Sequence, residues 1–594
     1  MNRSAILHIP MSQFSYGVDE KHITIRIRTG KNDIKKCKLN YGDRACRKTP
    51  VDFTCVEMEI VLSDNDFDYY EVNLSDPYKR LCYYFELDDG FEKKYYYGDF
   101  FSDKLVDDRS EYYQLPFNHR ADIVTPPQWA KEAIIYNIFP DSFATGQKYI
   151  SCKADEKIYM DENDPGRIFV VDDATKNITT DDGKGLILKS KHGGTINGIE
   201  VNVDYLKELG VNAIYINPIF TAGEYHKYDL IDYYHVDPCF GTNEDFKKMV
   251  ETYHKHGIRV IIDGVFNHCG WRFFAFEDVI RNGKKSIYSD WFYNLNYPVK
   301  RPDNFDEYPN YECFGYERLM PKLNTANKDV REYFCDVGKY WIKEFDIDGW
   351  RLDVASEIDD SFWREFYREV KSVKSDSILI GEVWESANHW LDGKIFDSAM
   401  NYDFRKHCRR FFAEESIDAC EFNSRVTNML MRYREQTVYA QLNILDSHDV
   451  SRFLSLCDNN RSKYKLAVVF QMCFPGMPTI FYGDEKGVTG VCEDEYRQPM
   501  PWKKEDGLFD FFRTLIYIRK SHTELTGGKY RAFPVNDNDK LYAFERIDGT
   551  NRIGVFLNMG NDVNVPYEGS VLLSEGYDND ILKQYGFVIF KNRG

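Results

Sequence analysis

The chain has 594 residues, with 77 Lys and Arg against 96 Asp and Glu, which gives a net charge of −19. Its hydrophobic content of 43% supports packed cores, its length predicts several domains, and its acidity disfavours nucleic acid and anionic membranes as partners. No apolar stretch approaches the roughly 20 residues that cross a bilayer, and the first ten residues do not read as a secretory signal. The 14 cysteines include no C-x-x-C pair, so we expect free thiols and a cytoplasmic protein.

The first segment, residues 1–122, predicts a β-sandwich. Ile23, Ile25 and Ile27 alternate with polar residues, and the same period of two recurs between Leu81 and Leu87. Alternation of this kind, interrupted by turn residues, indicates strands with one buried face. Two consecutive prolines at 126 and 127 then stop regular pairing, and we expect a linker there.

Short apolar segments alternate with helical patterns from residue 123 onward. This alternation predicts a central (β/α)8 TIM barrel formed by residues 123–268 and 328–522. The eight candidate strands are 134–139, 213–218, 260–265, 349–354, 378–383, 399–402, 441–445 and 479–482. Parallel strands in such a barrel place their carboxyl ends at one mouth, where active sites form.

Two long insertions interrupt the barrel pattern. Residues 269–327, after the third strand, are rich in aromatic residues, and we interpret them as a small inserted domain beside the cleft. Packing of those aromatics among themselves is the alternative interpretation. Residues 144–192 are polar, and the stretch from Asp161 to Gly166 superficially resembles a calcium loop. Because Pro165 takes a ligand position and Asp172 replaces the EF-hand Glu, we favour a solvated loop over calcium.

The C-terminal segment, residues 523–594, returns to strand patterns. Residues 540–545 and 552–557 are examples, and Gly527 and Gly528 mark the break before them. We therefore expect a second β-sandwich after the barrel, which makes the chain multidomain with one sandwich at each end.

Three acidic residues lie at or just after the ends of predicted barrel strands. Asp353 and Glu382 end the fourth and fifth strands, and Asp449 follows the seventh. Barrel geometry brings such strand ends together, and glycosidic bonds are broken by paired carboxyl groups, one nucleophile and one acid/base. Arg351 lies two residues before Asp353, so both side chains point to the same side of the strand, where a guanidinium keeps a carboxylate ionised.

Five short segments resemble the signature regions of the α-amylase superfamily, in the same order. They are Asp263–His268, Met320–Asn324, Gly349–Asp353, Glu382–Trp384 and Ser447–Asp449. The N-terminal sandwich is similar to the module of neopullulanases, cyclomaltodextrinases and maltogenic amylases, and the chain therefore resembles that subgroup.

The resemblance implies a role for each acid and for several neighbouring residues. Asp353 would be the nucleophile, Glu382 the acid/base, and Asp449 the residue that stabilises the distorted sugar and its transition state. The substrate-binding residues implied by the same motifs are Tyr228, His268, Arg351, His448, Asn324, Glu357, Trp384 and Arg497. Asp263 resembles a supporting residue, and Glu493 stands where relatives usually carry Asp.

The implied activity is retaining hydrolysis of α-1,4 bonds in cyclodextrins, maltodextrins and pullulan, with some α-1,6 cleavage or transglycosylation. A predominantly transferring 4-α-glucanotransferase and a non-catalytic glucan-binding protein are the alternatives. No cofactor or metal is required, since carboxyl groups perform both proton transfer and nucleophilic attack. The subgroup's arrangement of the N-terminal module further implies a homodimer.

Overall fold

The computed structural model describes residues 1–146, 157–161, 164–171, 186–187, 190–302, 307–505, 507–533 and 540–592. Between residues 147 and 189 it describes only the backbone of β12 (Lys157–Asp161), β13 (Asp164–Val171) and β14 (Leu186–Ile187), which form a three-stranded sheet. The side chains of the segment considered for calcium, Asp161 to Gly166, lie outside the described residues.

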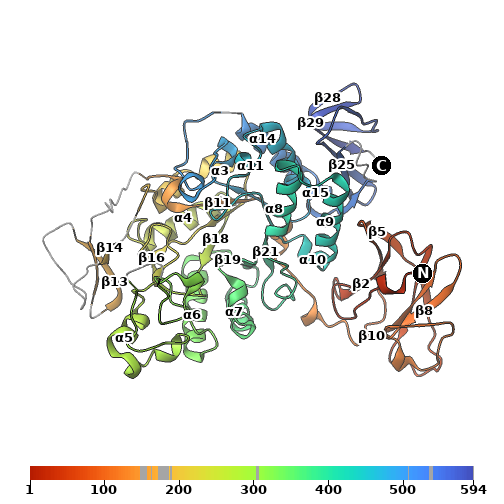
Figure 1. The fold of residues 1–594 in the computed structure, drawn as a ribbon, viewed down its shortest axis with the longest axis horizontal. Helices are drawn as coiled ribbons and strands as arrows, with labels where there is room; N and C mark the ends of the chain where they lie inside the picture. The colour runs from red at the N-terminus through yellow and green to blue at the C-terminus, as the bar shows by residue number, and fades with distance from the viewer. Residues whose placement is uncertain are drawn as a thin grey trace.

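The N-terminal domain contains two antiparallel sheets packed face to face (Figure 1). One sheet has the order β1 (Ser15–Gly17), β2 (His22–Gly30), β6 (Phe67–Ser75) and β5 (Glu59–Ser63). The other has the order β4 (Thr54–Glu57), β3 (Lys36–Asp43), β7 (Leu81–Asp88), β8 (Lys93–Tyr97) and β9 (Phe100–Ser102), with β10 (Tyr113–Leu115) on β7. Ile23, Ile25 and Ile27 face the shared core, which confirms the predicted sandwich.

The centre of the molecule is a closed barrel of eight parallel strands, one from each predicted strand segment. In order they are β11 (Ile135–Ile138), β15 (Ala213–Ile216), β18 (Arg259–Gly264), β19 (Gly349–Leu352), β20 (Ile378–Gly381), β21 (Ser398–Asn401), β22 (Leu442–Ile444) and β23 (Met477–Phe481). The predicted (β/α)8 barrel is therefore confirmed.

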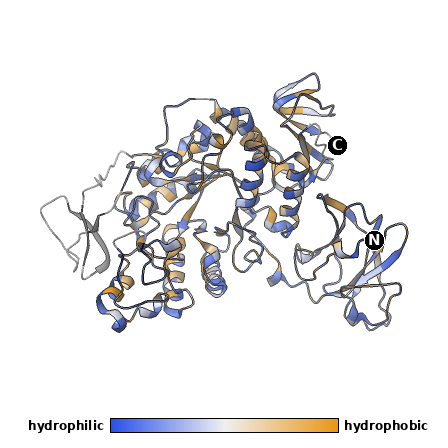
Figure 2. Ribbon diagram, viewed as in Figure 1, coloured by the Kyte–Doolittle hydropathy of each residue, from blue (hydrophilic) through white to orange (hydrophobic). Residues whose placement is uncertain are grey.

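Helices surround the barrel and bury their apolar faces against it, as the hydropathy colouring in Figure 2 shows. The longer ones are α4 (Asn243–Lys255), α6 (Lys328–Phe345), α7 (Asp360–Val373), α9 (Ala419–Met431), α12 (Arg461–Cys473) and α14 (Leu508–Ser521). Helix α6 shows how the sequence sets their limits. The Asn327 side chain accepts hydrogen bonds from the first turn, and Asp346 ends the helix in a left-handed conformation.

The segment between β18 and α6 forms a small unit around α5 (Phe274–Asn282). Phe276, Trp291, Phe292 and Tyr311 are buried within it, so much of its aromatic content packs internally. The alternative interpretation of these aromatics therefore holds for that group. Isolated bridges, including the one between His268 and Lys322, tie the unit to the mouth of the barrel.

The C-terminal domain is a single connected sheet with an apolar layer on each face. Its order is β24 (Lys529–Ala532), β25 (Leu541–Asp548), β26 (Asn551–Asn558), β29 (Ile581–Asn592) and β27 (Val563–Asn564), with β28 (Ser570–Asp578) also on β29. Phe544, Val555 and Ile589 join the barrel core, whereas Val588 and Phe590 belong to a separate cluster. The barrel helices thus supply one packing layer of this domain.

None of the helices in the described ranges is long and apolar enough to cross a membrane.

Two buried arginines lie near the junction of the barrel with the C-terminal sheet. Arg519 donates to the backbone carbonyls of Met472, Phe474 and Gly476, which lead into β23. From β25, Arg546 donates to the carbonyl oxygens of residues 473, 525 and 528. Arg519 thus ties α14 to the connection between α12 and β23 within the barrel, whereas Arg546 ties the C-terminal sheet to the barrel through the Cys473 carbonyl. Both arginines supply donors to buried carbonyls that water cannot reach.

We expect Arg546→Met to lower the free energy of unfolding by about 2–4 kcal/mol, because the change removes the arginine donor from the buried carbonyls of Cys473 and Leu525, while the Gly528 carbonyl retains only the Tyr439 hydroxyl. The thermal unfolding midpoint, read by calorimetry, measures the effect. Arg552→Met, at a partly exposed position of the neighbouring strand β26, is the matched control and should shift the midpoint little. Equal shifts of the unfolding midpoint for Arg546→Met and Arg552→Met would contradict the stabilising role given to Arg546.

Candidate active site

One buried guanidinium organises the carboxyl groups at the mouth of the barrel. Arg351, in β19, is completely buried. Its Nη1 donates to Asp353 Oδ1 at 2.8 Å and to both carboxylate oxygens of Asp263 at 2.9 and 3.0 Å. Its Nη2 lies 2.8 Å from Glu382 Oε1. Asp353 and Glu382 therefore lie on the two terminal nitrogens of one guanidinium. The contact between Arg351 and Asp353 is the one that their two-residue spacing predicted.

The turn that follows Asp353 is strained, and Glu382 stabilises it. Val354 has φ 45° and ψ 44°, a left-handed conformation that a β-branched residue rarely adopts. In this conformation the Val354 backbone N–H donates to Glu382 Oε2 at 2.8 Å, and the Ala355 N–H donates to the Glu382 carbonyl at 3.2 Å. A strained backbone of this kind clusters at functional sites, and here it fixes the distance between the two acids.

Trp384 covers the other side of the Glu382 carboxyl. Its indole Nε1 donates to Glu382 Oε1 at 3.2 Å, and its ring stacks on Tyr402 with centroids 3.9 Å apart. With 48% of its surface exposed, the indole presents an aromatic face to solvent beside the acid. Sugar rings pack their C–H faces on such surfaces.

The third acid, Asp449, is joined to the site by an imidazole and a guanidinium other than Arg351. Its Oδ2 lies 3.1 Å from His448 Nε2, and its Oδ1 lies 3.5 Å from Arg497 Nη2. Arg497 also donates to the His448 carbonyl at 2.8 Å and to Glu493 Oε1 at 2.6 Å. Glu493, the residue that departs from the subgroup pattern, thus orients the arginine that approaches Asp449.

Tyr228 and His448 form a stacked pair in the floor of the site. Their rings lie 5.3 Å apart and 5° from parallel. The Tyr228 hydroxyl donates to Asp263 at 2.9 Å and lies 2.5 Å from His448 Nε2, while Asn217 Nδ2 lies 2.9 Å from His448 Nδ1. Burial lowers the pKa of His448 well below its usual range, so the ring is neutral. With Asn217 as the donor to Nδ1, the proton of His448 is on Nε2 and faces Tyr228 and Asp449.

His268 is a second neutral imidazole near this floor. Burial lowers its pKa to about 3. Its Nε2 lies 3.2 Å from the Tyr228 carbonyl, and its ring stacks on Phe314 of the inserted unit at 5.0 Å. The ring therefore couples the inserted unit to the loop that carries Tyr228.

Two of the predicted substrate-binding residues contact the inserted unit and make no hydrogen bond or ion pair with the three acids in the described structure. The Asn324 amide donates to the backbone carbonyl of Asp290 at 2.9 Å and so holds the inserted unit. Glu357 is about half exposed and forms an ion pair with Lys322 at 3.1 Å. The structure thus brings Arg351, His448, Tyr228, Trp384 and Arg497 to the acids, but leaves Asn324 and Glu357 at the junction with the inserted unit.

The acids outnumber the nearby cations, and this imbalance keeps protons in the site. Burial raises the pKa of Asp353 well above its usual range, an effect that Arg351 opposes and Glu382 reinforces. Burial and the neighbouring Glu382 raise the pKa of Asp449 to about 7. A cluster that retains a proton near neutral pH contains both an ionised and a protonated carboxyl, the pair that general acid and nucleophilic chemistry need.

Two residues of this network were missed in the sequence. Asn217 directly follows β15, and Tyr402 directly follows β21. Both positions satisfy the rule that residues at the carboxyl ends of barrel strands line the site, so that rule alone could have found them.

Comparison with known proteins identifies the family. The α-amylase catalytic domain matches residues 137–525, and the N-terminal Ig-like domain of α-amylases matches residues 1–119. The chain belongs to the α-amylase family of glycoside hydrolases. It is 38% identical to a cyclomaltodextrinase of Geobacillus thermopakistaniensis over 95% of this chain and 92% of that protein. It is 39% identical to neopullulanase 2 of Thermoactinomyces vulgaris, over 93% of this chain and 90% of the relative.

Solved structures agree with this assignment. A cyclomaltodextrinase superposes with a TM-score of 0.86 at 34% identity, covering 100% of this chain and 98% of the other. The type III pullulan hydrolase of Thermococcus kodakarensis gives a TM-score of 0.81 at 27% identity, over 99% of this chain and 100% of that chain. This α-amylase-family chain is thus a member of the cyclomaltodextrinase, neopullulanase and maltogenic amylase subgroup.

The raised pKa of Asp449 predicts that this residue destabilises the fold at neutral pH. The carboxyl is easier to ionise in the unfolded chain, so its contribution to stability is present below about pH 4 and is lost as the pH rises through about 7. We expect Asp449→Asn to raise the free energy of unfolding by about 1–3 kcal/mol at pH 8, since each pKa unit corresponds to about 1.4 kcal/mol and partial exposure reduces the effect.

Unfolding midpoints between pH 4 and pH 8 measure this gain, which should vanish at the acidic end. Asp107→Asn, at an exposed position, is the control and should show no gain that grows with pH. A constant difference between Asp449→Asn and the wild type across that range would contradict the interpretation.

Proposed function

We propose that the protein hydrolyses α-1,4 bonds of cyclodextrins, maltodextrins and pullulan with retention of configuration, and cleaves some α-1,6 bonds. The observation that carries this proposal is the single guanidinium of Arg351, which holds Asp353 and Glu382 side by side. Retaining glycosidases require two carboxyls only about 5 Å apart, because no water has to fit between the nucleophile and the sugar. The names of the relatives supply the substrates.

In the first step an Asp353 oxygen attacks the anomeric carbon of the bound sugar. Glu382, acting as the general acid, transfers a proton to the glycosidic oxygen as the bond from that oxygen to the anomeric carbon breaks. Arg351 favours the ionised form of Asp353 by donating a hydrogen bond to it. Asp449 faces the site with its carboxyl held by His448 and Arg497, where it stabilises the positive charge that develops on the sugar.

In the second step a water molecule attacks the anomeric carbon of the Asp353 ester. Glu382 takes a proton from that water, the ester bond breaks, and Asp353 is ionised again. No cofactor takes part, because carboxyl groups supply the nucleophile, the acid and the base.

Transfer to a sugar acceptor is a second activity that the site favours. The half-exposed Trp384 ring lies beside Glu382 and offers a platform for an acceptor sugar, whose hydroxyl would replace water in the second step. A purely non-catalytic binding role is disfavoured, since all three acids are present and two share one guanidinium.

Reducing sugar released from β-cyclodextrin, pullulan and soluble starch tests the proposal. We expect Asp353→Asn and Glu382→Gln each to lower kcat at least about 10³-fold, because each removes one participant in the covalent step. Asp336→Asn, exposed on α6, is the matched control and should be as active as the wild type. Undiminished hydrolysis by Asp353→Asn would refute the mechanism, and products with inverted configuration would refute retention.

We further propose that the chain is a cytoplasmic homodimer. The cysteines of the described ranges are all free thiols, which suits a reducing compartment, and a relative from Bacillus subtilis is named intracellular maltogenic amylase. The N-terminal domain exposes Phe91 and Phe100, with 96% and 73% of their surfaces accessible. Exposed phenylalanine side chains supply apolar contact area when two protein surfaces associate.

Light scattering at micromolar concentration checks the oligomeric state. We expect a dimer mass for the wild type and a shift toward monomer for the double variant Phe91→Ser and Phe100→Ser, because it removes apolar contact area. Tyr517→Ser, which alters an exposed aromatic residue of α14, should leave the mass unchanged. A monomeric wild type would remove the proposal.

A further inference from the structure

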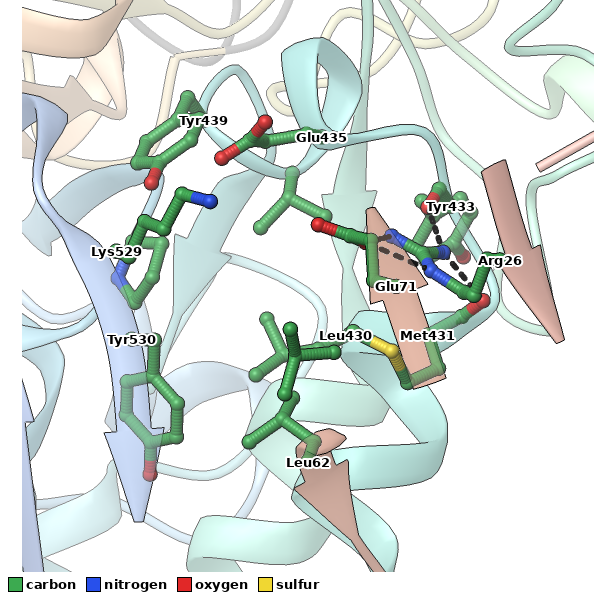
Figure 3. A pocket seen from close by; sticks show the side chains of 13 residues that line it. Arg26, Leu62, Glu71, Leu430, Met431, Tyr433, Glu435, Tyr439, Lys529 and Tyr530 are labelled. Atoms are coloured by element: carbon green, nitrogen blue, oxygen red, sulfur yellow. Dashed lines mark hydrogen bonds and ion pairs between the residues drawn. The ribbon is translucent and has the colours of Figure 1, made fainter. Parts of the chain in front are cut away.

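A pocket of about 80 Å³ lies where the N-terminal domain, the barrel and the C-terminal sheet meet (Figure 3). Its walls come from β2, β5 and β6, from the end of α9 and from α10 (Glu435–Val438), and from β24. The barrel residues among them, such as Tyr439 and Pro475, precede β22 and β23. The pocket therefore lies at the amino ends of the barrel strands, opposite the mouth that holds the three acids.

A buried ion pair forms one wall and fixes the domains relative to each other. Arg26 Nη2 lies 2.8 Å from Glu71 Oε2, and both side chains are almost completely buried. Arg26 Nη1 also donates to the backbone carbonyls of Met431 and Tyr433, at 3.3 and 3.4 Å. This wall is thus rigid, and its charges are already paired.

The opposite side of the pocket carries polar groups that are available to a ligand. Among the described residues, the Glu435 carboxylate has no hydrogen bond and no ion pair, although it is largely shielded from solvent and its pKa is raised by burial. Lys529 extends its ammonium group toward the same space in Figure 3. The lining contains two cations and two anions, Arg26 and Lys529 with Glu71 and Glu435, so the balance favours an uncharged polar ligand.

Two tyrosines give the pocket aromatic surface. The Tyr439 hydroxyl donates to the Gly528 carbonyl at 2.8 Å, and the Tyr530 hydroxyl lies 2.5 Å from that of Tyr542. Because both hydroxyls are held by the protein, the rings are fixed in the wall. An aromatic surface next to a carboxylate and an ammonium group suits a sugar, which has both an apolar C–H face and a rim of hydroxyls.

A second hollow of about 320 Å³ adjoins the pocket and shares Val61 and Leu62 with it. Asn423 of α9 lines this hollow, and its side-chain oxygen is buried without a hydrogen-bond partner in the described structure. Arg531 and Phe533 complete its C-terminal side. The two hollows adjoin at β5 and form a groove between β5, α9 and β24.

We propose that this groove, which we call the junction groove, is a second, non-catalytic site for an α-glucan oligosaccharide. The identity of the sugar rests on the proposed function, since it takes the ligand to be of the same class as the substrate. A sugar in the junction groove contacts three domains at once and stabilises their arrangement, as any ligand that binds only the folded state does.

The test uses the full-length chain with Asp353→Asn as background, so that the ligand is not consumed. Maltotetraose is the probe, and calorimetric titration counts the sites. We expect two sites in this background and one after Val61→Trp is added, because the indole fills the groove where its two hollows meet. Glu435→Gln should weaken the second site at least fivefold and leave the first unchanged, since it replaces the free carboxylate by a weaker acceptor.

Val571→Trp, at an exposed position of β28, is the matched control and should retain two sites. The unfolding midpoint, and cyclodextrin hydrolysis by Val61→Trp in the chain with Asp353 intact, show that the variant folds. A single site in the Asp353→Asn background, or two sites that Val61→Trp leaves unchanged, would overturn the proposal. Failure of the proposed function is a separate outcome, because it would appear as a wild-type chain that releases no sugar from any glucan.

Discussion

The shared guanidinium of Arg351 is the constraint on which the active site depends. Three carboxyl groups from three strand ends contact it, and without it their mutual repulsion in a buried site would push them apart. Asp263 does not face the reacting sugar in the proposed mechanism, but it receives Arg351, Tyr215 and Tyr228 together. Asp263, in β18, thereby holds both Arg351, which contacts the nucleophile, and Tyr228, which is predicted to stack on the sugar.

The same arrangement places function and stability in opposition. The carboxyls are close because catalysis needs them close, and burial then raises the pKa of Asp353 and Asp449. The large barrel core and its interlocked domains offset this cost, as does the hydrogen bond that the strained Val354 turn makes to Glu382.

Much of this site could be predicted from sequence because strand periodicity is local. The two-residue spacing of Arg351 and Asp353 determined their contact, and strand ends located Glu382 and Asp449. Side-chain hydrogen bonds that depend on loop geometry could not be predicted, and Asn324 illustrates this, since its amide holds Asp290. Likewise, the C-terminal strands predicted a domain but could not show that barrel helices would cover one face of a single sheet.

The position of the N-terminal domain links the two sites proposed for this chain. Its contacts to its own barrel run through α9 and α10, for example from Ser63 to Asn423 and from Gly17 to Gln436, and these residues precede β22. Within one chain the domain is therefore attached at the amino end of the barrel, away from the acids, where it forms the junction groove. The acids at the opposite end of the barrel are therefore not covered by the chain's own N-terminal domain.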